Sequence, residues 1–317
     1  QAPQQFKQLL MVGGVPRYYQ IAPCFRDEDP RADRLYGDFY QLDLEMSFID
    51  DGEIVRQTVE PLIKQLTTDF GGKKLLFNDI PRIPYQEAMD KYGVDKPDLR
   101  YGLELIDLTA TFKDTSFKVF QTPVVKAIRV PHGADLSRSQ IDNFTELARR
   151  HGAGGLAYLI YENDTVRSPI AKFLSEAELS EIKKRTGATN GDAVFFGADT
   201  REKVNQVLGQ LRIAFADHFN LKDDNLVALC WIVDFPFYEW NDGENKLDFG
   251  HNPFSMPKGG LAALEAAHTD TEKLALLADQ YDMVMNGCEI CSGAVRNHNP
   301  DIMYKVFEIL GFDKNYV

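Results

Sequence analysis

The stretch FRDEDPRADR, residues 25–34, contains residue types that could bind a charged ligand. Seven of its ten residues are charged, namely Arg26, Asp27, Glu28, Asp29, Arg31, Asp33 and Arg34. A connection of this length and charge does not fit a tight hairpin turn. Long charged loops are more often functional than short ones, so we expect this one to bind a ligand. The simpler interpretation is a set of solvent-exposed ion pairs.

A second candidate for chemistry is the C-x-x-C pair of Cys288 and Cys291. Cys24 and Cys230 stand alone, and an isolated C-x-x-C pair is a weak signal for zinc or redox chemistry. Four cysteines in a chain of 317 residues do not resemble a disulfide framework. We expect a reducing, cytoplasmic environment.

The elements beside the charged loop are predicted strands. Residues 38–48, DFYQLDLEMSF, alternate in polarity, and residues 17–25, RYYQIAPCF, precede the loop as the partner strand of a hairpin. One face of the second strand carries Tyr40, Leu42, Leu44, Met46 and Phe48, and the other carries Phe39, Gln41, Asp43, Glu45 and Ser47. We expect the apolar face to pack on a core and the polar face to be solvated or to carry a site.

Composition sets wider limits. The chain is 44% hydrophobic and 26% charged, which is typical of a globular protein of roughly two domains. No apolar run approaches the ~20 residues of a membrane span, and we expect neither a signal peptide nor a membrane partner. The net charge of −13 argues against indiscriminate nucleic-acid binding but leaves room for an RNA held by local basic residues. Because the chain begins with Gln1 rather than Met, we expect a fragment or a processed chain.

The middle of the chain alternates strands and helices. Strands are predicted at 124–130, 155–161 and 192–198, and helices follow Ser137, Ser175 and Thr200. Ser137 with Gln140, and Ser175 with Glu178, have capping-box spacing. This alternation predicts an α/β-type module over about 110–224 that interrupts antiparallel material.

After residue 225 the pattern again indicates long strands, at 228–240 and 281–299. A last helix is predicted with Asn299 as its cap, Pro300 in its first turn and Gly311 as its stop. Upstream, residues 50–70 have helical spacing and 78–84 are predicted to be extended.

Several ordered segments together resemble one known family. FRDEDPRADR followed by FYQLDLEMSF resembles motif 2 of class II aminoacyl-tRNA synthetases, specifically the bacterial-type aspartyl-tRNA synthetases. Six further segments are similar to that family: QAPQQFKQLLM (1–11), YGVDKPDLR (92–100), RVPHGADLSRSQID, FFGAD (195–199), HNPFSMP and NGCEICSGAVRNHN. The resemblance covers essentially the whole chain.

The resemblance implies an α+β fold, with a class II antiparallel sheet flanked by helices. An α/β-type, GAD-like insertion domain is expected at 110–224, between catalytic portions at 1–109 and 225–317. It also implies activation of L-aspartate by ATP with Mg²⁺, then transfer to tRNA-Asp and possibly tRNA-Asn, by a homodimer.

The resemblance assigns the nucleotide to the motif 2 hairpin. Arg26 is the expected catalytic residue, since a guanidinium can bridge the substrate carboxylate and the α-phosphate. Asp27 and Glu28 are expected to bind ATP, with Glu28 accepting from the adenine amino group. Phe39 is expected to stack on the adenine ring.

The aspartate pocket is assigned to seven residues: Gln4, Lys7, Arg26, Gln41, Asp43, His251 and Arg296. Asp43 suits the substrate ammonium, and Lys7 and Arg296 suit its side-chain carboxylate. Asp282 and Glu289 are the expected magnesium ligands, with Glu289 also on ATP, because Mg²⁺ prefers hard oxygen ligands. Glu289 and Arg296 have opposite strand parity, so we expect a bulge between them, at Gly293.

The chain departs from the family pattern in several places. Asn252 stands where the family often has a second histidine, Cys288 where it has tyrosine, and Cys291 where it has glycine or alanine. Motif 2 carries one extra residue within 35–37. Nothing resembles motif 1, the anticodon-binding barrel or motif 3, so we expect this chain alone to be poorly active.

Two other functions stay open. An ammonia-dependent asparagine synthetase uses the same adenylate, although the segment 110–224 resembles a module of tRNA-dependent families. A synthetase-derived binding module without activity usually lacks catalytic residues, whereas Arg26, Glu28, Asp43, Glu289 and Arg296 are present here.

Overall fold

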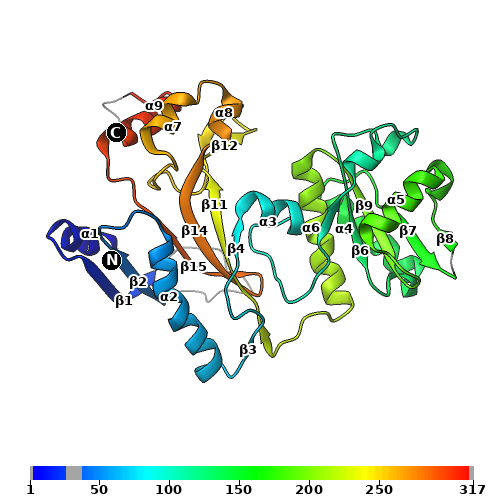
Figure 1. Ribbon diagram of the computed structural model, residues 1–317, viewed down its shortest axis with the longest axis horizontal. Coiled ribbons are helices and arrows are strands. Elements are labelled where there is room, and N and C mark those ends of the chain that lie inside the picture. The colour runs from blue at the N-terminus through cyan, green and yellow to red at the C-terminus, as the bar shows by residue number, and fades with distance from the viewer. Residues whose placement is uncertain (1–2, 26–37, 164, 314–317) are drawn as a thin grey trace.

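The computed structural model describes residues 3–25, 38–163 and 165–313. Figure 1 shows a β-hairpin with helix α1 at the left, a helix-flanked sheet in the middle, and a second helix-flanked sheet at the right. Residues 26–37, which include Arg26, Asp27 and Glu28 of the charged loop, lie outside the described residues.

The predicted motif 2 hairpin is confirmed on both sides of its loop. Strands β1 (Arg17–Phe25) and β2 (Asp38–Met46) pair antiparallel, from Arg17 opposite Met46 to Phe25 opposite Asp38. Helix α1 (Pro3–Val12) contacts β1.

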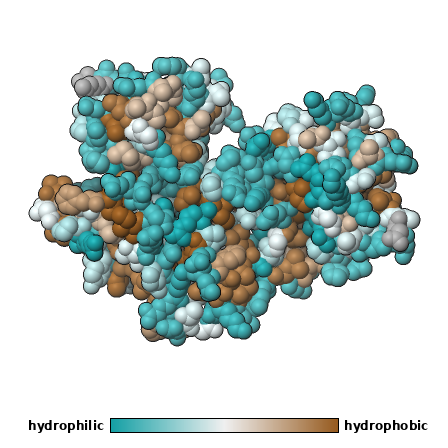
Figure 2. All heavy atoms as spheres, viewed as in Figure 1, coloured by the Kyte–Doolittle hydropathy of each residue, from teal (hydrophilic) through white to brown (hydrophobic). Residues whose placement is uncertain are grey.

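The apolar face of this hairpin is exposed in the described chain, so the expectation that it packs on a core is wrong here. Tyr19 and Ile21 of β1 and Tyr40 and Leu42 of β2 are exposed, Tyr40 to 70%. In Figure 2 brown, hydrophobic residues gather at this end of the molecule. The polar face is the covered one, because Lys7 of α1 reaches across to carboxylates of β2.

The middle sheet has the order β15-β14-β11-β4. Its strands are β4 (Arg82–Pro84), β11 (Leu229–Pro236), β14 (Leu277–Met285) and β15 (Cys288–Ala294). β4 runs parallel to β11, and the other two pairs are antiparallel. The short strands β3 (Lys74–Leu75) and β10 (Leu226–Val227) form a separate parallel pair.

Helices cover the two faces of this sheet. The apolar side of α2 (Glu53–Gln65), which continues as a π-helical turn over Leu66–Phe70, packs against Trp231, Tyr281 and Met283. Helix α3 (Tyr85–Tyr92) packs on the other face, where Ala88 meets Ile232 and Phe235.

The segment predicted as one strand, 281–299, is instead part of a hairpin. β14 ends at Met285, Asn286 and Gly287 take positive φ angles of 52° and 86°, and β15 begins at Cys288. Asn-Gly is a preferred dipeptide for a two-residue hairpin turn because both positions require positive φ. The predicted strand 228–240 is likewise divided into β11 and β12 (Tyr238–Asn241).

A small apolar cluster lies above the sheet in Figure 1. It draws residues from β12, β13 (Lys246–Phe249), α7 (Gly260–Ala266) and α9 (Pro300–Ile309), and α8 (Asp270–Leu274) contacts β12 beside it. The predicted start of α9 is confirmed, since the Asn299 side chain accepts hydrogen bonds from the backbone of Asp301 and Ile302.

The inserted module contains a five-stranded sheet of order β5-β6-β9-β7-β8. Its strands are β5 (Leu105–Asp107), β6 (Val124–Val130), β7 (Ala157–Glu162), β8 (Thr165–Arg167) and β9 (Ala193–Asp199), and all its ladders are antiparallel. The predicted α/β type is therefore wrong for this module, whose sheet is of the α+β type. Helices α4 (Arg138–Arg150) and α6 (Arg201–His218) contribute to the core on one face, and α5 (Glu176–Thr186) to that on the other. Short 3₁₀ turns cover 109–112, 118–120, 133–135 and 171–173. Both predicted capping boxes are confirmed.

Buried contacts fix α6 of the module against α3. Gly93, with φ of 72°, approaches Gly209 of α6 so closely that a Cβ on Gly209 would lie 2.7 Å from the Gly93 carbonyl oxygen. Lys126 of β6 is 2% exposed and donates to the Asp90 carbonyl oxygen, to Asp90 Oδ1 and to Asn205 Oδ1. These contacts join the module and the middle region through packing as well as through the chain.

Candidate active site

The polar face of the hairpin carries a cluster centred on the Lys7 ammonium. Lys7 Nζ lies 2.9 Å from Asp43 Oδ1 and 2.7 Å from Glu45 Oε1, and the residue is 8% exposed. Burial would lower the pKa of Lys7, but the hydrogen bonds and charges of Glu45 and Asp43 outweigh it and raise that pKa. Lys7 is therefore a fixed cation. Asp43 and Glu45 use two of its three N–H donors, which leaves one for a ligand.

Neighbouring side chains order this cluster. Gln20 Nε2 donates to Asp43 Oδ2 at 3.1 Å, so Asp43 is held from two sides. The Cys24 thiol donates to Gln41 Oε1 at 3.2 Å, on the same face of the hairpin. The structure thus places Lys7, Gln41 and Asp43 of the expected aspartate pocket on one surface.

Glu45 and Gln20 were missed as candidate site residues. Glu45 shares the parity of Gln41 and Asp43 in β2, and this parity was the available signal. Gln20 lies directly opposite Asp43 in the hairpin register, which becomes visible only once the pairing is known.

The expected magnesium ligands lie on β14 and β15. Asp282 is 4% exposed, and its Oδ1 atom has no hydrogen-bond partner among the described residues. Burial, followed by the charge of Glu289, raises the pKa of Asp282 to about 7. The two carboxylates are therefore electrostatic neighbours.

Their geometry corrects the predicted position of the bulge. The β14–β15 register shifts where Met283 opposes Cys291 and Val284 opposes Glu289, so Ile290 is the extra residue. The expected bulge at Gly293 is wrong, since Gly293 pairs regularly with Tyr281. A Cβ at Gly293 would lie 2.5 Å from the Tyr281 ring, which gives the small residue a packing reason instead.

These residues fit a magnesium ion that arrives with a nucleotide. No group of three or more His, Cys, Asp or Glu side chains gathers to hold a metal in the described parts of the chain. Mg²⁺ commonly uses one or two carboxylates, with water and phosphate oxygens completing its shell. The unpartnered Asp282 oxygen beside Glu289 suits that donor set.

The remaining candidates lie at separate places. His251 is exposed, and the centroid of its ring lies 4.9 Å from the ring centroid of Phe235 and 5.9 Å from that of Tyr85. Arg296 is exposed beyond the end of β15, where its backbone bridges to Ser255. Gln4 on α1 and Phe39 on β2 are partly buried. Among the described residues, no ion pair or hydrogen bond joins the side chains of Lys7, His251 and Arg296 to one another.

The C-x-x-C pair forms no disulfide, and its partly buried member Cys291 is a poor nucleophile. All four cysteines are free. Burial raises the pKa of the Cys291 thiol to about 11, so its thiolate is scarce near neutral pH. Cys288 is exposed at the start of the same strand, β15.

A mainly antiparallel sheet, a polar hairpin face and an acidic pair with a buried Asp282 are arranged as expected for a class II synthetase core. A family model described as "tRNA synthetases class II (D, K and N)" matches residues 1–317, and the chain belongs to this family.

The chain is also similar to individual members. It is 51% identical to an "Aspartate--tRNA(Asp/Asn) ligase" of Rickettsia bellii and 50% identical to that of Rickettsia prowazekii, and both alignments cover 100% of this chain. They cover 54% and 53% of those proteins, so the chain spans about half the length of the curated relatives it matches. Among solved structures, an aspartyl tRNA synthetase from Entamoeba histolytica aligns with a TM-score of 0.41 at 16% identity, over 100% of this chain and 42% of that one.

Proposed function

We propose that the protein containing this chain activates L-aspartate with ATP to aspartyl-adenylate and transfers the aspartyl group to tRNA-Asp. Relatives at about 50% identity bear the name aspartate–tRNA(Asp/Asn) ligase, which also makes tRNA-Asn a candidate acceptor. The observation that carries the proposal is the buried Lys7 ammonium held by Asp43 and Glu45.

This cluster suits an amino acid with a charged side chain. The remaining N–H donor of Lys7 can bind the side-chain carboxylate of aspartate, and Asp43 can accept from the substrate ammonium. Because Lys7 and Gln20 already hold Asp43 in place, binding of the substrate costs little side-chain entropy at Asp43. Gln4, Gln41, His251 and Arg296 complete the proposed pocket.

Activation joins the α-carboxylate of aspartate to the α-phosphorus of ATP and releases pyrophosphate. We assign Arg26 to stabilise the charge that develops on the α-phosphate, together with Asp27, Glu28 and Phe39 as nucleotide contacts. A magnesium ion held by Asp282 and Glu289 would neutralise phosphate charge. The adenylate is then attacked by a ribose hydroxyl at the 3′ end of the tRNA, and AMP leaves.

The setting of the reaction is also a proposal. We assign the protein to the cytoplasm and to a homodimer. No helix in the described ranges is long and apolar enough to cross a membrane.

The test is ATP–pyrophosphate exchange by the complete protein, with L-aspartate and L-asparagine compared. Exchange that depends on aspartate supports activation, and aminoacylation of tRNA-Asp and tRNA-Asn then separates the acceptors. An ammonia-dependent asparagine synthetase would form asparagine from the same adenylate without tRNA. A binding module would show no exchange with either amino acid, which would refute the proposal.

A matched pair of variants tests the pocket itself. Lys7→Met removes the fixed cation, whereas Lys64→Met removes a lysine from the last turn of α2 outside the pocket. Aspartate-dependent exchange should fall at least 10²-fold for the first and stay unchanged for the second. Equal activity of the two variants would remove Lys7 from the site.

A further inference from the structure

Lys96 supplies a cation to the acidic pair from a different part of the chain. Its Nζ lies 3.4 Å from Glu289 Oε2 and 2.9 Å from Asp95 Oδ2. Burial would lower the pKa of Lys96, but the hydrogen bond with Asp95 and the charges of Asp95, Glu289 and Asp282 outweigh it and raise that pKa. The Lys96 ammonium therefore contacts two carboxylates and lies in the field of a third, Asp282, and the Lys96 side chain is 31% exposed.

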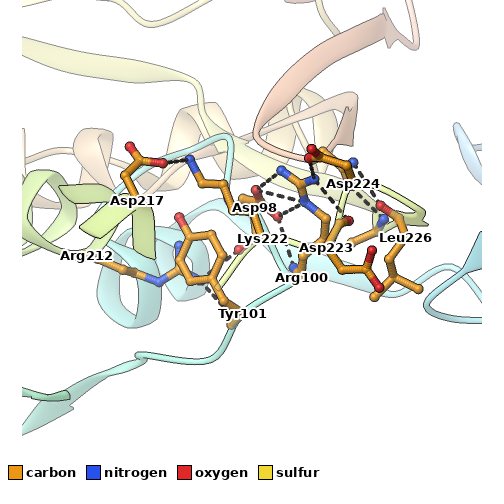
Figure 3. A network of polar contacts seen from close by, with 11 residues as sticks. Asp98, Arg100, Tyr101, Arg212, Asp217, Lys222, Asp223, Asp224 and Leu226 are labelled. Carbon is orange, nitrogen blue, oxygen red and sulfur yellow. Dashed lines mark hydrogen bonds and ion pairs between the residues drawn. The ribbon is translucent and has the colours of Figure 1, made fainter. Parts of the chain in front are cut away.

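The loop that carries Lys96 is held firmly on its C-terminal side. Figure 3 shows Arg100 turned toward Asp98, with guanidinium-to-carboxylate distances of 2.8 to 3.2 Å. Arg212 of α6, which is fully buried, donates through Nη2 to the carbonyl oxygens of Asp98, Tyr101 and Gly102. Three backbone carbonyl groups of this loop are hydrogen-bonded to one buried guanidinium, and breaking these bonds would leave buried polar groups without partners. This anchoring therefore fixes the loop in one position.

The loop also touches the turn of the β14–β15 hairpin. A Cβ at Gly287 would lie 3.4 Å from Asp98 Cβ and 3.8 Å from the Lys96 carbonyl oxygen. Gly287 is followed after one residue by Glu289, so the backbone that carries the cation and the backbone that carries the carboxylate are in contact. The ion pair between Lys96 and Glu289 is thus built from two fixed backbones.

We propose that Lys96 is a built-in counter-ion that occupies the acidic pair Asp282 and Glu289 until magnesium arrives with the nucleotide. This inference rests on the proposed assignment of those carboxylates to magnesium. The ammonium lies against Glu289 Oε2, on the carboxylate that the metal would also use, and two cations close together repel each other. Lys96 therefore weakens binding of free Mg²⁺, and only Mg²⁺ accompanied by phosphate charge binds well.

The simpler interpretation is that Lys96 only ties the loop to β15. Removing the charge of Lys96 distinguishes the two interpretations. A structural tie predicts lower stability and no gain of metal affinity. A counter-ion predicts tighter binding of Mg²⁺ alone, because a competing positive charge is gone.

The experiment is calorimetric titration of the complete protein with magnesium chloride alone, at pH 8.5. The variants are Lys96→Met, Lys96→Arg as the charge-retaining variant, and Lys91→Met as a matched control. Lys91 lies on α3, the helix that precedes the loop with Lys96. Its Nζ forms an exposed ion pair with Glu87 Oε1 at 2.8 Å and does not contact the acidic pair.

We expect Lys96→Met to bind free Mg²⁺ about tenfold more tightly than wild type, with Lys96→Arg and Lys91→Met near wild type. Unchanged or weaker binding in Lys96→Met would overturn the counter-ion role, and a lowered melting temperature beside it would indicate a structural tie. Asp282→Asn and Glu289→Gln separate this outcome from failure of the site assignment. If these two variants leave Mg²⁺ binding unchanged, the carboxylates are not the metal ligands and the proposed site itself is wrong.

Discussion

The proposed aspartate site has two cations, Lys7 and Arg296, and they differ in how much of their charge nearby carboxylates already balance. Lys7 is buried and held by two carboxylates, whereas Arg296 is exposed at the end of β15. A guanidinium can bind both oxygens of a carboxylate at once, so we assign the larger part of the discrimination against asparagine to Arg296.

Arg296→Leu in the complete protein should therefore change specificity. Asparagine would place an NH₂ donor against cationic donors, and such polar pairing can discriminate by roughly 10⁴. We expect aspartate-dependent exchange to fall at least 10²-fold and the asparagine-to-aspartate activity ratio to rise. A loss of only a few-fold, with the ratio unmoved, would remove Arg296 from the carboxylate site.

Arg26→Ala tests the catalytic assignment in the charged loop. Loss of one donor that stabilises transition-state charge lowers rates by about 10² to 10³, and kcat/KM for aspartate activation should fall by that factor. The melting temperature should stay within about 2 °C of wild type. Unchanged exchange would return Arg26 to the surface ion-pair interpretation.

Asp282 gives the metal-free protein a specific pH dependence. Its pKa rises from an ordinary value of 3.8 to about 7 on folding, so the folded protein retains a proton that the unfolded chain has lost. The stability that this proton confers is lost as pH rises from about 4 through about 7. Its upper limit is about 4 kcal/mol, at 1.36 kcal/mol per pKa unit.

Asp282→Asn removes this dependence, because the amide is uncharged at every pH. Denaturant unfolding without magnesium should show the variant gaining stability over wild type between pH 5 and pH 8. Two curves that stay parallel over this range would show that burial of the Asp282 charge does not govern stability.

At the scale of elements, the contact between α3 and α6 depends on two glycines. A helix interior normally favours Ala over Gly by about 1 kcal/mol, so Gly209→Ala in α6 would be stabilising without its surroundings. The added Cβ would instead meet the Gly93 backbone at 2.7 to 3.0 Å. We expect Gly209→Ala to lower the free energy of unfolding by about 2 to 3 kcal/mol.

Gly102→Ala is the control for that substitution. Gly102 also lies near α6, since its carbonyl oxygen accepts a hydrogen bond from Arg212. A Cβ at Gly102 would meet nothing within 4 Å, and its φ is not in the left-handed region. Its unfolding curve should stay within about 0.5 kcal/mol of wild type. If Gly209→Ala changed the free energy of unfolding as little as Gly102→Ala does, the close contact between α3 and α6 would not contribute to stability.

Most elements of this fold could be predicted from local patterns. The capping boxes at Ser137 and Ser175 and the cap at Asn299 marked helix starts correctly, because they depend on residues three or fewer positions apart. The hairpin at 286–287 was missed although Asn-Gly signals one, since the small residues around it suggested a continuous strand.

The site was less accessible to such reasoning. Sequence alternation placed Gln41, Asp43 and Glu45 on one face, but it could not give the bulge at Ile290, which depends on pairing across two strands. Lys96 comes from a loop almost two hundred residues before Glu289, and no local pattern relates them.

At the scale of the whole molecule, the described chain exposes a continuous apolar area on the hairpin. Tyr19, Ile21, Tyr40 and Leu42 project from one face of β1 and β2, and such patches favour association. We expect this chain, when expressed alone, to self-associate at micromolar concentration. Light scattering after size exclusion should show larger species, and Ile21→Lys with Leu42→Glu should reduce them; a monodisperse monomer before substitution would contradict this.

The two ends of the inserted module meet where Arg100 Nη1 approaches the Asp223 carbonyl oxygen at 3.4 Å and Asp224 Oδ1 at 3.6 Å. The closeness of these ends bears on the order of folding. Strands β4 and β11, which pair through Ile83 and Ile232, are far apart along the chain, and closing so long a loop lowers chain entropy. The module between them is contiguous and has its own apolar cores, so it can form first. Once it has formed, its adjacent ends bring β4 and β11 within reach, and the middle sheet assembles as if its two halves were joined by a short connection.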